Sequence, residues 1–225
     1  MNEILADHVK GSYCLVYIDD VLVMSETFDD HMRHVAAVIE SMAGAGLRLN
    51  PTKCSFFKQQ IEYLGHIVTA NQITPNPEKV RAIKEFPKPE TKAEMLSFMG
   101  LVNYLGRFLP NLSAKLSPMR ELVAKLKHLK DKIPWNFADT LEFEKTKQLC
   151  SETVALTMPC PGRPYFISTD ASFSGLGAML EQDNDQGERK VVSLMSRTLT
   201  KAERKYSVTE LEAVAVIFAL KKFHV

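Results

Sequence analysis

The sequence of 225 residues has few cysteines, no long apolar run and no repeat. Cys14, Cys54, Cys150 and Cys160 lie far apart without a Cys-x-x-Cys pair, which argues against a zinc site or disulfide framework and suits a reducing compartment. No apolar stretch approaches the ~20 residues that a membrane span needs. Met1–Lys10 has no basic region followed by an apolar stretch, so no signal peptide is expected. These absences predict an intracellular protein that is neither secreted nor bound to a membrane.

Charge is nearly balanced over the chain, at +1, but it is unevenly distributed. Residues 1–70 contain five basic and nine acidic residues, residues 71–135 twelve and six, and residues 136–225 eleven and twelve. A basic middle favours contact with a nucleic-acid backbone, and carboxylates at the two ends favour divalent cations. A solvated basic helix face would produce the same counts, so charge alone leaves both interpretations open.

The first chemical motif is the acidic pair Asp19-Asp20. Within Ser12–Ser25, two β-rich apolar runs flank this pair, a pattern typical of a hairpin. Adjacent carboxylates repel each other, and a bound divalent cation offsets that repulsion. Paired Mg²⁺ ions in turn organise phosphoryl transfer. Asp-Asp is also a good turn dipeptide, and a bare pair is better explained that way; the apolar flanks favour the metal interpretation.

Periodicity and turn residues predict the remaining elements. Thr91, with Glu94 three residues later, predicts a capped helix start. The expected helices are Phe28–Ala45, Thr91–Phe108, Leu112–Leu129, Leu141–Glu152 and Ser207–Phe223, and the expected strands are Leu47–Asn50, Ser55–Lys58, Ile61–Thr69, Tyr165–Thr169, Gly175–Glu181 and Val191–Ser196.

Tyr17-Ile18-Asp19-Asp20, followed by Val21-Leu22-Val23, resembles the YxDD motif of reverse transcriptases. The rest of the chain is similar in order and spacing to reverse transcriptases of the Ty3/gypsy class of LTR retrotransposons. Each motif is weak alone, but their order along nearly the whole chain makes chance implausible. The matching stretches are His31 to Leu49, Leu49-Asn50-Pro51-Thr52-Lys53-Cys54-Ser55-Phe56, Tyr63-Leu64-Gly65-His66-Ile67-Val68, Met99-Gly100-Leu101-Val102-Asn103-Tyr104, Arg107-Phe108-Leu109-Pro110, and Asp170-Ala171-Ser172 with Gly175-Leu176-Gly177-Ala178.

The resemblance implies an α+β fold in four parts. These are a partial reverse transcriptase palm (1–76) with the YxDD hairpin and a primer-grip-like hairpin, a helical thumb (77–133), a connection (134–162) and a partial RNase H-like α/β domain (163–225). The chain would be a Pol polyprotein piece, truncated at both ends. The implied reactions are RNA-directed DNA synthesis and hydrolysis of RNA in RNA–DNA hybrids, both two-metal phosphoryl transfers. The alternative is a non-catalytic nucleic-acid-binding remnant of a decayed or domesticated retroelement.

The resemblance also assigns roles in the polymerase part. Asp19 and Asp20 would bind the metals. Lys53 matches a palm lysine near the incoming triphosphate, a general acid for the leaving group; a plain surface lysine is the other interpretation. Tyr63, Leu64, Gly65 and His66 match the hairpin that holds the primer end. Gly65 would let the backbone approach the nucleic acid closely, or it is an ordinary hairpin glycine.

In the implied thumb, four basic side chains are expected to bind the phosphates of a duplex in a salt-sensitive way. Tyr104 and Phe108 share a helix face, and we expect them in the core and not stacked on bases. The four basic residues are Lys92, Arg107, Lys115 and Arg120.

In the implied RNase H part, Asp170 ends a strand and would bind metal. Its partner on the last helix is Glu210 or Glu212, which point about 200° apart on a helix. The family places this acid seven residues before an Ala-Leu pair, and Ala219-Leu220 selects Glu212; Glu210 would then interact with the helix dipole. The apolar stripe through Ala215, Val216, Ala219 and Leu220 also continues from Glu212. Ser172 supports Asp170 or is a turn serine.

The family resemblance implies Mg²⁺ or Mn²⁺ as cofactor. The implied partners are an RNA template, a DNA primer, an RNA–DNA hybrid, dNTPs and the rest of the Pol polyprotein. The implied location is a cytoplasmic virus-like particle or the nucleus.

The sequence departs from the family at both sites. A complete polymerase site of the family has a further Asp upstream of the YxDD hairpin. No acid before Ser12, Asp7 included, is assigned to that position. The fingers and the later RNase H acid are also absent. Because two-metal catalysis needs all ligands positioned together, we expect little or no activity from this chain alone, and poor solubility. His31 and His34 share a helix face, for which a solvated surface is preferred over a metal site. His224 is expected to be structural or to lie in a frayed helix end.

Overall fold

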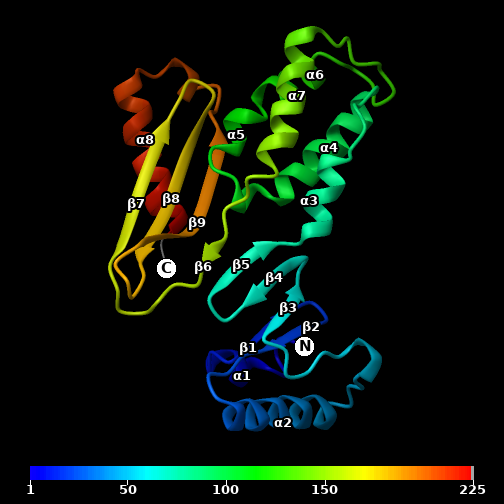
Figure 1. Ribbon diagram of the computed structural model, residues 1–225, viewed down its shortest axis with the longest axis vertical. Helices are drawn as coiled ribbons and strands as arrows, with labels where there is room; N and C mark the ends of the chain where they lie inside the picture. Colours follow the sequence, from blue (N-terminus) through cyan, green and yellow to red (C-terminus); the bar gives the residue numbers. More distant parts are fainter. Residues whose placement is uncertain (224–225) are drawn as a thin grey trace. The chain divides into compact units, whose positions relative to one another are not determined.

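The computed structural model describes residues 1–223, so the expectation for His224 lies outside the described residues. The chain forms two compact units, Met1–Lys58 and a second that begins at Gln59. Both contain helices and sheets, which confirms the α+β class (Figure 1). No helix within residues 1–223 combines the length and the apolar character required to cross a membrane.

The first unit combines a hairpin with two helices. Thr27 caps the longer helix by accepting a hydrogen bond from the Asp30 N–H at 3.2 Å. The helices and one face of the hairpin enclose a small core built on Leu5, Cys14, Val38 and Met42. The elements are α1 (Ala6–Lys10), β1 (Cys14–Tyr17), β2 (Asp20–Val23), α2 (Phe28–Gly44) and the short 3₁₀ helix η1 (Pro51–Lys53).

The second unit begins with a four-stranded antiparallel sheet and continues into a group of helices. The last strand of this sheet follows the helices in the chain and pairs with the third strand, so the chain returns to the sheet. The strands are β3 (Gln60–Tyr63), β4 (His66–Thr69), β5 (Gln72–Pro75) and β6 (Leu156–Thr157), and the helices are α3 (Pro77–Lys84), α4 (Lys92–Tyr104), η2 (Gly106–Phe108), α5 (Leu112–Lys115), α6 (Ser117–Ala124) and α7 (Phe137–Leu149).

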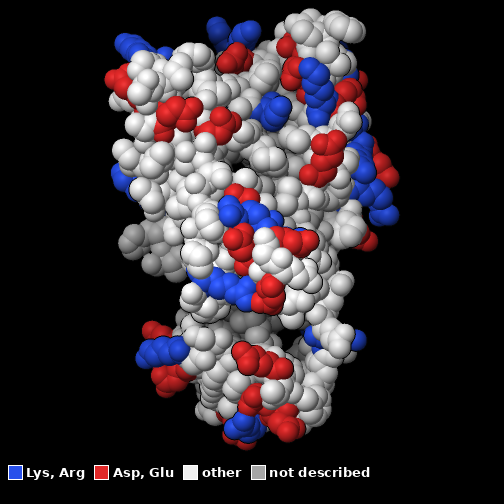
Figure 2. All heavy atoms as spheres, turned by 60° about the vertical axis from the view of Figure 1, so that its left-hand side comes forward, with Lys and Arg blue, Asp and Glu red and all other residues white. Residues whose placement is uncertain are grey.

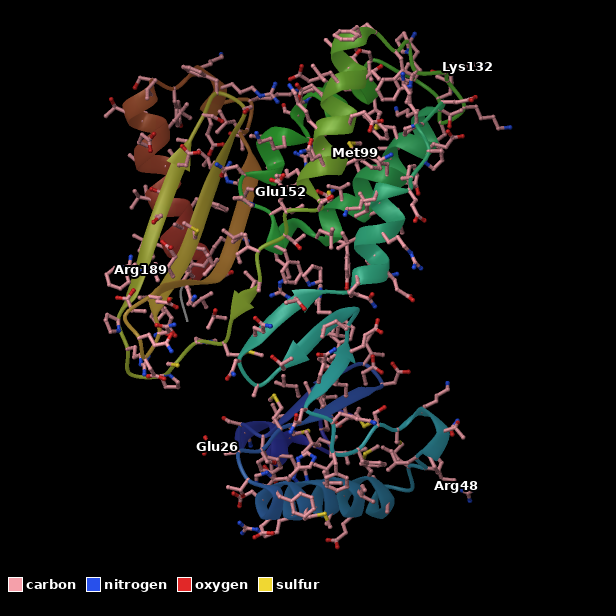
Figure 3. The ribbon with its side chains drawn as sticks, viewed as in Figure 1. Glu26, Arg48, Met99, Lys132, Glu152 and Arg189 are labelled. Atoms are coloured by element: carbon pink, nitrogen blue, oxygen red, sulfur yellow. The ribbon has the colours of Figure 1, made fainter. Side chains whose placement is uncertain are left out.

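One apolar core fills the space between these helices. The Phe98 ring lies 4.7 Å from the Phe143 ring, centroid to centroid, and both side chains are fully buried. Met99 points into the same core (Figure 3). This core joins residues of the expected thumb to residues of the expected connection. The boundary between 133 and 134 is therefore not a break in packing, and the four-part division stays a prediction.

The chain ends in a three-stranded antiparallel sheet with one helix packed on it. Leu176 and Ala178 of the central strand pack against Leu211 and Ala215 of the helix. The elements are β7 (Tyr165–Ala171), β8 (Gly175–Asp183), β9 (Arg189–Thr198), η3 (Glu203–Lys205) and α8 (Val208–Phe223). The three strands and the final helix confirm the predicted elements, with longer strands than expected.

Two predicted strands are wrong. Leu47–Asn50 has no strand partner, and the chain enters η1 directly after it. Ser55–Lys58 is interrupted by Phe57, whose φ of 56° is incompatible with an extended strand. The predicted strand Ile61–Thr69 instead forms a hairpin by itself, in which β3 pairs with β4.

Two predicted helices are shorter than expected. Thr91 caps α4, accepting from the Glu94 N–H at 3.4 Å, and the Glu90 N–H bonds to the Glu94 carboxylate and lowers its pKa. The helix ends at Tyr104, and η2 follows. The stretch Leu112–Leu129 divides into α5 and α6, because Pro118 has no N–H to continue one helix.

Candidate functional site

The YxDD hairpin turns through two residues. Tyr17 pairs directly with Asp20, so Ile18 and Asp19 form the turn. Ile18 has a φ of 57°, as the tight turns of two-residue hairpins require at the first central position. For a β-branched residue this conformation costs roughly 1–3 kcal/mol. The acidic pair therefore sits at a strained, exposed tip, with Ile18 itself 74% exposed.

The register decides which face of the hairpin carries the acid. Directly opposed residues in an antiparallel pair lie on the same face. Val16 and Val21 oppose each other and both pack on the small core. Tyr17 and Asp20 form the next pair, so their side chains lie on the opposite face, away from that core. Asp20 is thus presented on the open side of the hairpin.

Near the base of the hairpin, three histidines and a tyrosine connect the helices of the first unit to the segments that flank the hairpin. The His34 ring stacks on Tyr13 with centroids 3.8 Å apart, and its Nδ1 lies 2.8 Å from the Ser25 hydroxyl. His31 Nδ1 lies 3.3 Å from the same hydroxyl, and His8 Nδ1 lies 2.5 Å from that of Tyr13. His31 and His34 are half-buried, so the expected solvated face is wrong: both tie α2 to the segment after β2.

Lys53 ends η1 and is exposed. The side chain of Asn50 caps this short helix by accepting a hydrogen bond from the Thr52 N–H at 3.1 Å. An exposed ammonium agrees with both interpretations of Lys53, and its role near a triphosphate stays a prediction.

The β3–β4 hairpin turns through Leu64 and Gly65, with φ values of 50° and 74°. Two left-handed residues in succession define the type I′ turn, in which a leucine is strained by about 1–2 kcal/mol. A Cβ at Gly65 would overlap the hydroxyl of Tyr104. This internal contact gives Gly65 a reason to be glycine that is independent of nucleic acid.

Tyr104 and Phe108 agree with their expected packing role. The Tyr104 hydroxyl donates to the Leu64 carbonyl at 2.8 Å, and its ring stacks on His66 with centroids 5.0 Å apart. Phe108 is fully buried and meets the same imidazole edge-on at 5.2 Å. Burial lowers the pKa of His66, and the nearby charge of Arg107 lowers it further.

The four basic side chains expected on a duplex separate into two groups. Lys92 donates to the Leu126 carbonyl at 2.7 Å, and Arg120 donates to the Ser113 carbonyl at 3.2 Å and hydroxyl at 3.0 Å. Burial lowers the pKa of Arg120. Arg107 and Lys115 are exposed. On the face seen in Figure 2, basic and acidic side chains are interspersed and form no uniformly basic stripe.

Asp170 lies on the face of its sheet that α8 does not cover. It opposes Gly177, whereas the neighbouring pair Ala171 and Leu176 packs against α8. The Asn111 amide donates to the Asp170 carboxylate at 2.8 Å. A cavity of about 330 Å³ lies beside this contact, lined by Asn111, Lys115, Asp170 and the turn that follows β7.

The two candidate acids of α8 differ in their surroundings. The N–H and hydroxyl of Ser207 both donate to the Glu210 carboxylate, at 2.7 and 2.8 Å, and lower its pKa. Glu210 therefore closes the first turn of its own helix, whereas no such bond holds Glu212 there; both side chains are exposed. The predicted stripe is partly wrong: Val216 and Leu220 are exposed, and the buried positions are Leu211, Ala215, Phe218 and Ala219. The preference for Glu212 stays a prediction.

Ser172 behaves as a turn residue. Its hydroxyl oxygen accepts from the Ser174 N–H at 3.3 Å and from the Gly175 N–H at 3.2 Å. Its hydroxyl also donates to the Gly175 carbonyl at 3.1 Å. These bonds shape the connection between β7 and β8, and none reaches Asp170.

Sequence reasoning missed Asn111. Asn111 has a φ of 52°, a conformation that asparagine tolerates better than most residues. The contact to Asp170 joins segments far apart in the chain, so a short window of sequence around Asn111 does not show it.

The predicted acidic residues supply only some of the ligands that a metal ion needs. Carboxylate oxygens are suitable donors for Mg²⁺, and Asp19, Asp20, Asp170 and Glu212 are all exposed. Within residues 1–223, however, no three His, Cys, Asp or Glu side chains come together in a group that could hold a metal ion. The described residues therefore do not form a complete metal site, and each acid supplies at most part of one.

Two protein-family models match these regions. "Reverse transcriptase (RNA-dependent DNA polymerase)" matches residues 1–68, and "RNase H-like domain found in reverse transcriptase" matches residues 135–225. The first contains the YxDD hairpin, and the second contains Asp170 and Glu212. The chain is therefore of the reverse transcriptase and RNase H class.

Relatives along nearly the whole chain identify the family. The chain is 36% identical over 230 residues to the Retrovirus-related Pol polyprotein from transposon gypsy of Drosophila melanogaster, covering 99% of this chain and 22% of the relative. It is 36% identical over 227 residues to that from transposon opus of the same organism (98% and 22%), and 30% identical over 221 residues to the Transposon Tf2-3 polyprotein of Schizosaccharomyces pombe (98% and 16%). The chain belongs to the gypsy-type retroelement Pol polyproteins. It spans about a fifth of the length of these relatives.

Solved structures share the fold. The foamy viral protease-reverse transcriptase in complex with RNA/DNA hybrid matches with a TM-score of 0.82 at 23% identity, over 98% of this chain and 29% of that chain. The same protein in complex with dsDNA matches with a TM-score of 0.80 at 23% identity, over 98% and 46%. At this identity the likeness establishes the fold alone.

Proposed function

We propose that this chain is the part of a Pol polyprotein that carries the YxDD hairpin, the primer-holding hairpin and the first acids of the RNase H-like domain. In the whole polyprotein it would serve RNA-directed DNA synthesis from dNTPs and degradation of RNA in RNA–DNA hybrids. The observation that carries this proposal is the left-handed Ile18 turn, which places Asp19 and Asp20 on the exposed tip of a hairpin. Strain of this kind persists where the surrounding structure supports a function.

The two hairpins and the final sheet would each have a different role. The first hairpin would present Asp19 and Asp20 to a divalent cation, Mg²⁺ or Mn²⁺. Further acids would complete the set of ligands around that cation. The second hairpin would hold the primer end, with the exposed Arg107 beside it for phosphate. Asp170 and Glu212 would supply part of the second site. Because the described residues form no complete metal group, the chain itself is expected to bind nucleic acid more readily than to turn it over.

Binding and catalysis are tested separately. The isolated chain is titrated with a fluorescent primer–template at several salt concentrations, and we expect affinity that falls steeply with salt. Loss of binding at low salt would contradict the proposal. For catalysis, the chain replaces the matching segment of the gypsy polyprotein, with Asp20→Asn as the inactive variant and Glu26→Gln as a control on an exposed acid outside the hairpin. We expect primer extension that Asp20→Asn abolishes and Glu26→Gln retains.

A further inference from the structure

The tip of the β3–β4 hairpin has the wrong local sequence for its shape. Type I′ turns favour Asn-Gly, Asp-Gly or Gly-Gly, because both central residues have a positive φ. Here the pair is Leu64-Gly65, and Leu64 has a φ of 50°. A leucine has no side-chain hydrogen bond to stabilise this conformation locally. Contacts from outside the hairpin must therefore hold the turn.

Tyr104 supplies those contacts from the end of α4. Its hydroxyl donates to the carbonyl of the strained Leu64 at 2.8 Å. The hydroxyl occupies the space that a side chain at residue 65 would fill, so tyrosine and glycine fit as a pair. Its ring stacks on His66 at an interplanar angle of 18°, and His66 Nδ1 lies 3.3 Å from the hydroxyl. The residues before and after Gly65, Leu64 and His66, thus both contact one side chain.

Tyr104 is itself held firmly. Its neighbours Val102 and Leu105 are fully buried in the helical core. A second anchor acts on the strand before the turn: Asn76, which caps α3, donates to the Glu62 carboxylate at 2.8 Å and is 7% exposed. The hairpin is therefore held at two points, by Tyr104 at the end of α4 and by Asn76 at the start of α3.

Part of the tip remains exposed to solvent. Leu64 is 39% exposed, and the exposed Arg107 brings a positive charge close enough to lower the pKa of His66. The tip is thus held in place by Tyr104, partly exposed and close to a positive charge. Such a tip suits the end of a nucleic-acid strand with its phosphate.

We propose that Tyr104 is a positioning residue for the primer terminus: its hydroxyl fixes the Leu64-Gly65 turn so that the tip meets the 3′ end in one orientation. This inference rests on the proposed function, because it assumes that the hairpin contacts a primer. It assigns to the hydroxyl a task beyond packing, since phenylalanine would keep the ring that stacks on His66 and lose only the hydrogen bond to Leu64. Tyr104→Phe therefore separates the two roles.

The test uses the full chain and a primer–template with 2-aminopurine at the primer 3′ end and a fluorescein label at the far template end. Fluorescein anisotropy measures overall affinity, and 2-aminopurine fluorescence reports the terminus. For Tyr104→Phe we expect overall affinity within about twofold of wild type, because phosphate contacts dominate it. We expect the 2-aminopurine response to fall by at least about half, as the loss of one neutral hydrogen bond allows. Tyr165→Phe, the same change at an exposed tyrosine of β7, should alter neither.

Gly65→Ala provides a second variant. It should also reduce the terminal response, because the new methyl group overlaps the Tyr104 hydroxyl. In the double variant with Tyr104→Phe, the part of its effect that comes from this overlap should disappear, whereas the strain of alanine at a φ of 74° remains. An unchanged 2-aminopurine response in Tyr104→Phe overturns the inference. So does a parallel fall in response, affinity and thermal stability, which marks a purely structural role. If wild type fails to bind the primer–template, the proposed function itself fails, and this inference fails with it.

Discussion

The side-chain amide of Asn111 donates a 2.8 Å hydrogen bond to the carboxylate of Asp170, although the two residues belong to different parts of the second unit. Asn111 precedes α5, and Asp170 lies near the end of β7. Gly177, opposite Asp170, has no side chain, and a Cβ there would overlap the Asn111 carboxamide. Asn111 therefore packs directly on the sheet, next to Asp170, an expected catalytic acid.

This fit predicts a coupling between Asn111 and Gly177. Gly177→Ala should cost about 1–3 kcal/mol of unfolding free energy, the usual range for overpacking. Asn111→Gly removes the carboxamide while tolerating the φ of 52°, and should cost about 0.5–1.5 kcal/mol for the lost hydrogen bond. In the double variant the Gly177→Ala cost should shrink, because the overlapping group is gone. Urea unfolding of the four proteins measures this; strictly additive costs would contradict it.

A second prediction concerns the strained turn at Ile18. Ile18→Gly should raise the unfolding free energy by roughly 0.5–1 kcal/mol, because glycine adopts a positive φ without strain, less its entropy loss on folding. Ile18→Val keeps the β-branch and should leave stability nearly unchanged. Thermal unfolding of the three proteins decides the matter. A Gly variant less stable than wild type would show that the Ile18 side chain contributes more than its backbone strain costs.

A third prediction concerns pH and the pair formed by Arg197 and Glu203. Two hydrogen bonds of 2.7 Å join the guanidinium to the carboxylate and lower the pKa of Glu203 from 4.5 to about 2. A lowered acid pKa stabilises the fold fully above pH 4.5, and this contribution is lost as the pH falls through about 2.

Glu203→Gln tests that dependence. At pH 7 it should be less stable than wild type by about 1.5–3 kcal/mol, the range for charge-assisted hydrogen bonds. The difference should narrow below pH 4.5 and vanish near pH 2. Glu188→Gln, at an exposed pair with Lys190, should leave stability nearly unchanged across the same pH range. A Glu203→Gln difference that persists unchanged at pH 2 would rule out the ion pair as its source.

A fourth prediction concerns metal and activity. With Mg²⁺ or Mn²⁺, the isolated chain should show no robust primer extension and no robust cleavage of an RNA–DNA hybrid. The reason is that residues 1–223 hold no cluster of three ligands that could bind a metal ion. Both assays are run beside an active reverse transcriptase on the same substrates. Robust turnover that disappears with Asp19→Asn or Asp170→Asn would refute the prediction.

Local sequence was enough for most of the elements but not for their partners. Thr91 and Glu94 marked the start of α4, and the apolar runs around Asp19 marked the first hairpin. The stretch Leu47–Asn50 alternates apolar and polar residues as a strand does, yet no strand pairs with it. A strand exists only when a neighbour satisfies its hydrogen bonds, and that neighbour is not visible in a short window.

The candidate sites show the same division. Lys92 and Arg120 looked like phosphate ligands in a basic segment, but both donate to groups inside the fold. Charge counts cannot distinguish a cation that faces solvent from one that bonds a carbonyl. His31 and His34 were expected at a solvated face and instead bond Ser25.

The order of short motifs by itself determined the family, because motif order is a property of the chain alone, and it predicted Asp19, Asp20 and Asp170 as metal ligands. Tertiary structure decided what supports those motifs: Tyr104 beneath Gly65, and Asn111 against Asp170. Both pairs join residues far apart in sequence. Their contacts depend on the packing of helices onto sheets, which brings such residues within hydrogen-bond distance only once the chain has folded.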